Sequence, residues 1–269
     1  MSTSPDIVNE ISKHGNSESS HAKNASNFEQ LISYCVGYAA NYNPSKAALK
    51  VASMTTLLTS VRTSIATEED KHNAYTNVVD AREILFSPSP LSKLVTKIMN
   101  ALKSSDVTKQ KIADAKTISR KISGQRANQK ALDAFITATT KDATTTPPSL
   151  ETEHKFISVS QMGYDNRLDN FSKLVNLLST EAGYAPNETS LKVTTLNTLL
   201  ADMKLKNTAV INAITALSNA RIDRNKYLYK DDTGVHDIVL NVKAYIKSVY
   251  GAKSPEYKQV SKLRFTKPR

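Results

Sequence analysis

The chain has 269 residues and a formal net charge of +11, so it is long enough to bury one large core or two smaller ones. Seven glycines and nine prolines are too few for the many tight turns of an all-β protein. A single cysteine excludes an internal disulfide, and no run of about 18 apolar residues predicts a membrane-spanning helix. Because the first residues lack the basic and apolar regions of a signal peptide, we expect a cytoplasmic protein.

Residues 1–26 are polar, and we predict a flexible arm there because few apolar side chains are available for packing. Ser26 and Asp169 each precede an Asn-Phe pair, and both residue types are good helix N-caps. Apolar residues then recur at spacings of three and four, as they do on one face of a helix. We therefore predict a helix of about 15 residues after each cap.

The next segment, Tyr42–Leu58, occurs a second time as Tyr184–Leu200, and the two are identical at 8 of 17 positions. Unrelated segments of this length would share about one identity. We therefore predict that the chain is a tandem duplication, with corresponding residues 142 positions apart in this motif. Ser45 and Asn187 are placed to cap a helix in each copy.

Each motif begins a long segment without Gly or Pro, residues 46–86 in the first copy and 188–229 in the second. Apolar residues recur along both at helical spacing, which predicts one long helix per copy. The polar run Thr67–Asn73 leaves a hinge or a tight hairpin as the alternative in the first copy. The corresponding residues of the second copy are less polar, which favours a continuous helix.

Turn residues end both long segments, Ser87–Pro90 in the first copy and Asp231–Gly234 in the second. Apolar residues at helical spacing follow each turn and predict a third helix. Tyrosines such as Tyr42 and Tyr184, near the start of each motif, are interpreted as packing residues with a solvent-facing hydroxyl.

A basic segment closes each copy. Residues 103–130 contain eight Lys or Arg against two acidic residues, and residues 243–269 contain eight against one. The rest of the chain therefore has a small net negative charge. We predict a helix in the first segment that continues to about residue 141. In the second segment, Gly251, Pro255 and Pro268 predict an irregular or extended chain.

These elements predict an all-α fold, an elongated helical bundle in which each copy is a short helix, a long helix, a short helix and a basic tail. Each copy alone offers little core thickness, so we expect the two copies to pack against each other. The predicted organisation is a flexible polar arm over 1–26, a first helical copy over 27–125, a connecting helix and Pro-Pro linker over 126–160, and a second copy with a basic tail over 161–269.

The pair Asn27-Phe28, the segment Tyr42–Lys46 and the stretch Val242–Val260, extended by Lys262–Phe265, occur together in this chain. In these features the chain resembles an uncharacterised group of duplicated, lysine-rich helical proteins that are common in Bacteroidetes. The resemblance covers most of the chain. It implies a bacterial origin and no particular activity.

The sequence predicts no catalytic, metal or cofactor site. The glycines are isolated and do not form a phosphate-binding loop, and Cys35 lies on an apolar stripe, which is typical of a buried structural thiol. Two Glu-x-x-His elements, Glu69–His72 and Glu151–His154, have the spacing that di-iron helical bundles use. We interpret both as solvated charged patches, because the first lies in a polar stretch without a counterpart in the second copy and the second follows the Pro-Pro linker.

Two polar pairs correspond between the copies, Arg82 with Arg224 and Asn77 with Asn219. We predict that they are buried or partly buried contacts that fix the register between the long helices. A functional groove lined by both arginines is the alternative.

The basic closing segments are the candidate site for an anion or an acidic partner. Such segments give sequence-independent, salt-sensitive affinity for nucleic acid. They also serve as solvated faces that confer solubility, or as surfaces that complement an acidic patch on another protein. The candidate residues are Lys109, Lys111, Lys116, Arg120 and Lys121 in the first segment, and Lys253, Lys258, Lys262, Arg264 and Lys267 in the second.

From these features we expect a non-enzymatic structural or assembly protein, a rigid helical bundle that self-associates or scaffolds partners. The expected partner is a second copy of the chain or another protein with an acidic surface. One alternative is sequence-independent, nucleoid-type binding of nucleic acid through the basic ends of the copies. A second alternative is a helical protein that interacts with membranes.

Overall fold

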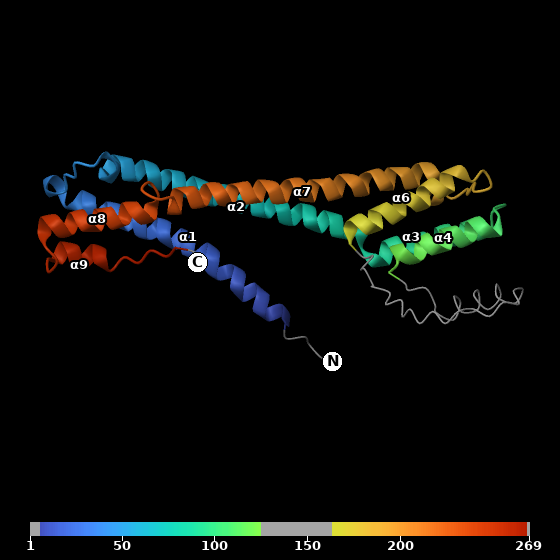
Figure 1. The fold of residues 1–269 in the computed structure, drawn as a ribbon, viewed down its shortest axis with the longest axis horizontal. Helices are drawn as coiled ribbons and strands as arrows, with labels where there is room; N and C mark the ends of the chain where they lie inside the picture. Colours follow the sequence, from blue (N-terminus) through green and yellow to red (C-terminus); the bar gives the residue numbers. More distant parts are fainter. Residues whose placement is uncertain (1–5, 125–162, 268–269) are drawn as a thin grey trace, which may run out of the picture. The chain divides into compact units, whose positions relative to one another are not determined.

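The computed structural model describes residues 6–124 and 163–267, with side chains from His21 onward (Figure 1). All secondary structure in these ranges is helical, which confirms the predicted all-α class. None of the described helices is long and apolar enough to cross a membrane. The described elements are α1 (Asp6–Gly37), η1 (Ala39–Asn41), η2 (Ala47–Leu49), α2 (Val51–Phe86), α3 (Pro88–Lys103), α4 (Lys109–Ile122), α6 (Tyr164–Thr180), η4 (Thr189–Leu191), α7 (Val193–Tyr229), α8 (Val235–Tyr250) and α9 (Pro255–Ser261).

The helices form two compact units. Unit 1 contains the residues up to Thr76 together with those from Asn212 onward, and unit 2 contains Asn77–Ile211. Both boundaries fall inside the long helices α2 and α7. Each unit therefore combines the first part of one predicted copy with the second part of the other.

Unit 1 has an apolar core to which α1, the first part of α2, the end of α7, α8 and α9 all contribute. The predicted stripe on α1 is buried in it, including Cys35, which is 1% exposed. Burial raises the pKa of the Cys35 thiol to about 11, as expected for a structural cysteine. The largest fully buried side chains of this core are Phe28, Leu31, Met54 and Leu228.

Unit 2 has a core of the same kind, formed by the end of α2 with α3, α4, α6 and the first part of α7. The third helix predicted after each long helix is confirmed by α3 here and by α8 in unit 1. The largest fully buried side chains of the unit 2 core are Phe86, Ile98, Leu102, Phe171, Leu174, Leu178, Leu196 and Met203.

The first helix of each copy begins earlier than the N-cap residues predict. Helix α1 begins at Asp6 and α6 begins at Tyr164, so Ser26 and Asp169 are exposed positions inside helices. The predicted arm over 1–26 thus contains helix, and its last residues pack into unit 1, where Asn24 is 3% exposed. The residues just upstream of Ser26 contain no Gly or Pro, so nothing ends the helix there.

The recurring motif, Tyr42–Leu58 and Tyr184–Leu200, has similar local structure at both places. The hydroxyl of Tyr42 donates to the carbonyl of Leu49 at 2.7 Å, and that of Tyr184 donates to Leu191 at 3.0 Å. Each bond closes a loop that ends in a 3-10 turn, η2 or η4. Both hydroxyls are therefore buried, and the prediction that they face solvent is wrong.

The long helices begin after these turns, because the residue that follows each turn has extended backbone, with ψ of 143° at Lys50 and 140° at Lys192. The predicted caps Ser45 and Asn187 therefore precede the 3-10 turns, not the long helices. Helix α2 continues without a break through Thr67–Asn73, so the continuous helix is confirmed and the hinge is excluded.

The two basic segments both contain helix. Helix α4 confirms the prediction for the first, whose continuation beyond Gly124 lies outside the described residues, as do the 126–160 linker and Glu151–His154. The prediction of an irregular second segment is wrong over Pro255–Ser261, which is α9. The hydroxyl of Ser254 accepts from the amide of Tyr257 at 3.0 Å, and Pro255 occupies the first turn, where proline is favourable.

Candidate anion-binding groove

Helices α3 and α4 of unit 2 are consecutive in the chain and pack beside each other (Figure 1). Helix α3 begins at Pro88, directly after the end of α2, and its apolar face is buried in the unit 2 core. Thr108 caps α4, because its hydroxyl accepts from the amide of Lys111 at 3.5 Å. Helix α6 packs against α4 and completes the site.

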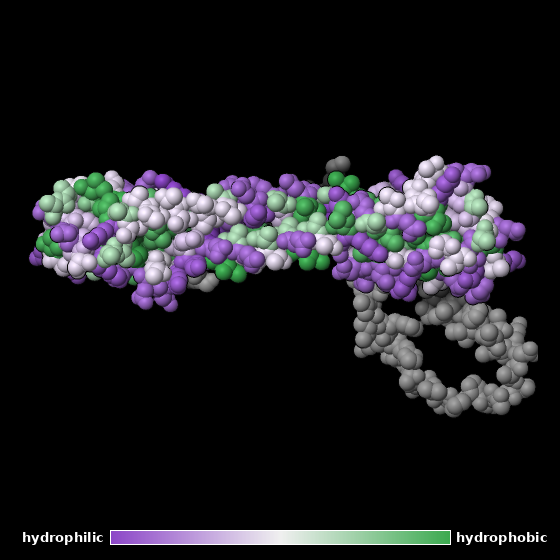
Figure 2. All heavy atoms as spheres, turned by 90° about the horizontal axis from the view of Figure 1, so that it is seen from above, coloured by the Kyte–Doolittle hydropathy of each residue, from purple (hydrophilic) through white to green (hydrophobic). Residues whose placement is uncertain are grey.

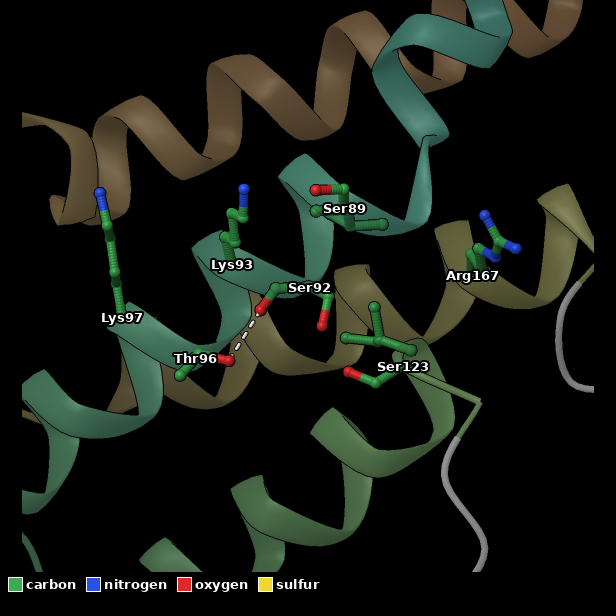
Figure 3. A pocket seen from close by; sticks show the side chains of 9 residues that line it. Ser89, Ser92, Lys93, Thr96, Lys97, Ser123 and Arg167 are labelled. Carbon is green, nitrogen blue, oxygen red and sulfur yellow. Dashed lines mark hydrogen bonds between the residues drawn. The ribbon is translucent and has the colours of Figure 1, made fainter.

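A cavity of about 720 Å³ opens where the first half of α3 meets the end of α4 and the first turn of α6. Figure 3 shows Lys93 and Lys97 projecting from α3 in the same direction, Ser123 at the end of α4, and Arg167 on α6. The hydroxyl of Thr96 donates to the carbonyl of Ser92 at 2.9 Å. The lining residues are Ser89, Leu91, Ser92, Lys93, Thr96, Lys97, Ile122, Ser123 and Arg167.

A second cavity of about 230 Å³ lies further along the same pair of helices. It shares Ser92, Thr96 and Ser123 with the first cavity, so the two are parts of one groove, called the α3–α4 groove below. The lining residues of the second cavity are Ser92, Val95, Thr96, Met99, Asn100, Lys103, Lys116, Ser119, Arg120 and Ser123.

Every charged side chain in the described lining of the α3–α4 groove is a cation, and none is a carboxylate. Salt bridges within the described residues do not involve any of these cations. Among the described residues, the groove therefore concentrates positive charge without a paired acid, and such a surface attracts anions. The six cations are Lys93, Lys97, Lys103, Lys116, Arg120 and Arg167.

Arg167 is the most constrained of these cations. One of its terminal nitrogens, Nη1, donates to the carbonyl of Phe86 at 2.6 Å, which fixes the guanidinium between the end of α2 and the groove. Its Nε is buried and has no hydrogen-bond partner within the described residues. A buried donor without a partner is costly, so the structure leaves one polar atom of this side chain unsatisfied.

The structure separates the predicted residues of the first basic segment. Lys116 and Arg120 line the α3–α4 groove. Lys111 instead pairs with Glu181 at 3.1 Å, which links α4 to the end of α6. Lys109 and Lys121 are exposed on α4.

The predicted residues of the second basic segment all belong to unit 1, and all of them are exposed. Lys267 lies 3.9 Å from the carboxylate of Asp231, and both side chains are more than half exposed. The predicted residues that lie on α9 or after it are Lys258, Lys262, Arg264 and Lys267, and Lys253 precedes it.

Sequence reasoning did not select four cations of the α3–α4 groove as candidate residues: Lys93, Lys97 and Lys103 on α3, and Arg167 on α6. Of these, only Lys103 lies in the predicted basic segment 103–130. A signal for the first three was present, because α3 contains no Asp or Glu and two of its lysines are four residues apart. No comparable signal marks Arg167, since only the packing of α6 against α4 brings it to the groove.

In unit 1, the residues after α9 are held in an extended conformation by side chains of α1 and α8. The amide side chain of Asn24 donates to the carbonyl of Thr266 at 2.8 Å and accepts from the Thr266 amide at 3.1 Å. Asn27 donates to the carbonyl of Arg264 at 2.7 Å. Lys243 donates to the carbonyl of Leu263 at 2.6 Å, and burial lowers its pKa. We call Leu263–Thr266 the C-terminal segment.

The two corresponding arginines contact different partners on the opposite long helix. In unit 1, Arg224 pairs with the buried carboxylate of Glu68 at 2.8 Å, and Arg221 pairs with the same carboxylate at 3.0 Å. In unit 2, Arg82 donates to Asn207 at 3.1 Å and its guanidinium lies 3.8 Å from the centre of the Tyr164 ring.

These contacts agree with the predicted register role of both arginines. The corresponding asparagines do not have that role, because Asn77 and Asn219 are both exposed.

No metal centre is found among the described residues, where no group of three metal-ligating side chains occurs. Glu69 is exposed and His72 is half-buried on α2. Comparisons of the chain with protein families, with curated proteins and with solved structures find no match.

Proposed function

We propose that this chain is a non-enzymatic, cytoplasmic scaffold protein that holds an acidic partner in the α3–α4 groove. The observation that carries the proposal is the set of six cations in the groove lining, with no carboxylate beside them in the described residues. The hydroxyls of Ser92 and Ser123, which line both parts of the groove, supply further polar contacts. A surface of this kind favours an anionic partner through both attraction and hydrogen bonding.

The architecture that we propose for this scaffold is a tandem duplication folded as a helical bundle. It is supported by the matching Tyr42 and Tyr184 hydrogen bonds and by the two 3-10 turns that they accompany. The corresponding arginines, Arg82 and Arg224, each contact the opposite long helix, which also supports it.

Charge reversal tests this function. In a titration with fluorescent oligoglutamate at low salt, the wild-type chain should bind, and Lys97→Glu/Lys116→Glu should weaken binding by about tenfold or more. The matched control is Lys253→Glu/Lys258→Glu, which changes the net charge equally at exposed sites of unit 1. Equal loss in both variants would mean that net charge, not the groove, attracts the ligand, and the proposal would be wrong.

Self-association is a second part of the proposed scaffold role. Some large apolar side chains are exposed, including Ile84 at 75%, Leu205 at 65% and Ile222 at 62%. On the face drawn in Figure 2, apolar side chains form small patches among hydrophilic ones. Light scattering over a range of concentrations measures the mass, and a strict monomer at high concentration would remove self-association from the proposal.

Sequence-independent binding of nucleic acid is the second candidate function, because lysines and hydroxyls are also the groups that contact phosphates. A gel-shift titration with duplex DNA tests it. Binding at about 50 mM salt that falls steeply with added salt would support this candidate, and absence of binding would exclude it. Release of dye from liposomes tests the membrane alternative.

A further inference from the structure

We propose that the α3–α4 groove binds an extended segment of an acidic partner protein, and that Arg167 hydrogen-bonds the backbone of that segment. This inference rests on the proposed function, because it names the form and chemistry of the acidic partner. Three observations carry it: an extended segment bound by related elements in unit 1, the unpartnered Nε of Arg167, and the apolar residues below the cations.

Unit 1 shows how these elements bind an extended chain. Aligning Asn27-Phe28 of α1 with Asn170-Phe171 of α6 makes Asn24 correspond to Arg167. Asn24 holds the C-terminal segment by two hydrogen bonds to the backbone of Thr266. In unit 2, Arg167 lines the α3–α4 groove at this corresponding position.

The unpartnered Nε of Arg167 supplies a matching donor. Asn24 uses its side-chain amide to donate to a backbone carbonyl of the C-terminal segment. The Nε of Arg167 is buried beside the groove and has no partner within the described residues. If the Arg167 side chain turns on binding so that Nε meets the groove, a backbone carbonyl of a bound segment would satisfy this donor, as main-chain hydrogen bonds do in other modes of peptide recognition.

The groove also accommodates apolar side chains. Leu91 and Ile122 line its larger part, and Val95 and Met99 line the smaller part, beneath lysines that are exposed. In unit 1, Leu263 of the C-terminal segment is buried in the core in a comparable way. A partner segment with alternating acidic and apolar residues would therefore direct carboxylates to the lysines and apolar side chains to the groove floor.

Charge and composition favour this occupant over the others. The C-terminal segment of a second copy contains Arg264 and is followed by Lys267, so the cationic groove would repel it. Residues 125–162 of the same chain contain four Lys or Arg and four Asp or Glu, so they have no net negative charge to match the cations. The described lining contains no aromatic side chain on which bases of a single strand would stack, and phosphates would not use the apolar floor.

A peptide titration tests the inference. Helix α3 has 16 residues and is about 24 Å long, and an extended peptide of about eight residues spans a similar length. The first probe is a fluorescent peptide of this length that alternates Glu with Leu. The second probe is a Glu and Ser peptide of the same length and charge, and the third is duplex DNA of matched size.

We expect the Glu-Leu peptide to bind at least about tenfold more tightly than the Glu-Ser peptide. Lys93→Glu/Lys97→Glu should remove most of this affinity, while Lys253→Glu/Lys258→Glu should leave it unchanged. Arg167→Met should weaken binding of the Glu-Leu peptide. The far-UV circular dichroism spectrum of this variant shows whether the fold is retained. If Arg167→Met unfolds, Arg167→Lys tests the same donor, since it keeps the charge but not the Nε position.

Equal affinity for the two peptides would overturn the inference and leave the proposed function standing, because the groove would then recognise charge alone. Tighter binding of DNA than of either peptide would overturn the inference in favour of the nucleic-acid candidate. No binding of the peptides or of oligoglutamate would contradict both the inference and the proposed function.

Discussion

Replacing Glu68 by alanine should destabilise unit 1 strongly, because the substitution leaves two guanidinium groups without their acid. The Glu68 side chain is 5% exposed, and its carboxylate contacts Arg224 at 2.8 Å and Arg221 at 3.0 Å. Arg224 is itself 9% exposed, so solvent does not replace the lost partner. Removing one member of a buried ion pair typically costs about 3–5 kcal/mol.

The matched control is Glu29→Ala, which breaks an ion pair of similar geometry at the surface. Glu29 and Arg62 lie 2.6 Å apart, but their side chains are 53% and 52% exposed. Solvent screens such a pair, so its removal should cost about 0–1 kcal/mol. The contrast between the two alanine variants therefore measures the effect of burial on one kind of contact.

The assay is urea denaturation followed by far-UV circular dichroism. With an m-value of roughly 2–3 kcal/mol/M, Glu68→Ala should lower the midpoint by about 1–2.5 M. The double variant Glu68→Leu/Arg224→Met should recover much of this loss, because an apolar pair of similar size replaces the buried charges. A Glu68→Ala midpoint equal to that of Glu29→Ala would refute the reasoning.

Three further predictions concern packing and titration. Gly183→Ala should destabilise unit 2 by about 1–3 kcal/mol, because a Cβ at this position would lie 2.2 Å from the backbone carbonyl oxygen of Asp106. The control is Gly37→Ala, where a Cβ would meet nothing within 4 Å, and equal denaturation midpoints for the two variants would contradict the prediction. Burial lowers the pKa of His21 below its ordinary 6.5, so the unfolded chain binds the proton more readily and the free energy of unfolding should fall as pH drops below about 6.5. In urea titrations at pH 7.5 and 5.5, His21→Gln should reduce the difference in stability between the two pH values, and an unchanged difference would argue against this role of His21. Cys35 should react with iodoacetamide at pH 8 much more slowly in the native chain than in urea, because its pKa is about 11 and the thiol is buried; equal rates measured by mass spectrometry would show that the thiol is accessible.

The helices were predictable where the sequence excludes other structures. The segments that became α2 and α7 contain no Gly or Pro and keep helical spacing of apolar residues, so a continuous helix was the favoured reading. The start of α1 was not predictable from Ser26, because a residue that can cap a helix does not interrupt a helix that has already begun upstream. The start of α9 was predictable, since Ser254-Pro255 is a typical helix start that the nearby Gly and Pro obscured.

The candidate site was predictable only in part. Lys116 and Arg120 belong to a basic segment that the charge distribution marks clearly. The groove, however, forms because α4 packs beside α3 and α6, which brings cations from three helices together. That packing depends on tertiary contacts among buried residues such as Ala115 and Phe171, and no local pattern specifies it.

Unit 1 joins residues from the beginning and the end of the given sequence, so it can fold only late in synthesis. Its core joins Phe28 and Met54 to Ile246 and Val260, whereas unit 2 uses only Asn77–Ile211. All residues of unit 2 are therefore synthesised before unit 1 is complete. Until then, the apolar faces of α1 and of the first part of α2 lack α8 and α9, against which they pack in the unit 1 core. At about 5–20 residues per second, the stretch from Thr76 to residue 267 takes roughly 10–40 s to emerge. During that interval, the apolar stripe of α1 is the part of the nascent chain that most needs protection by a chaperone.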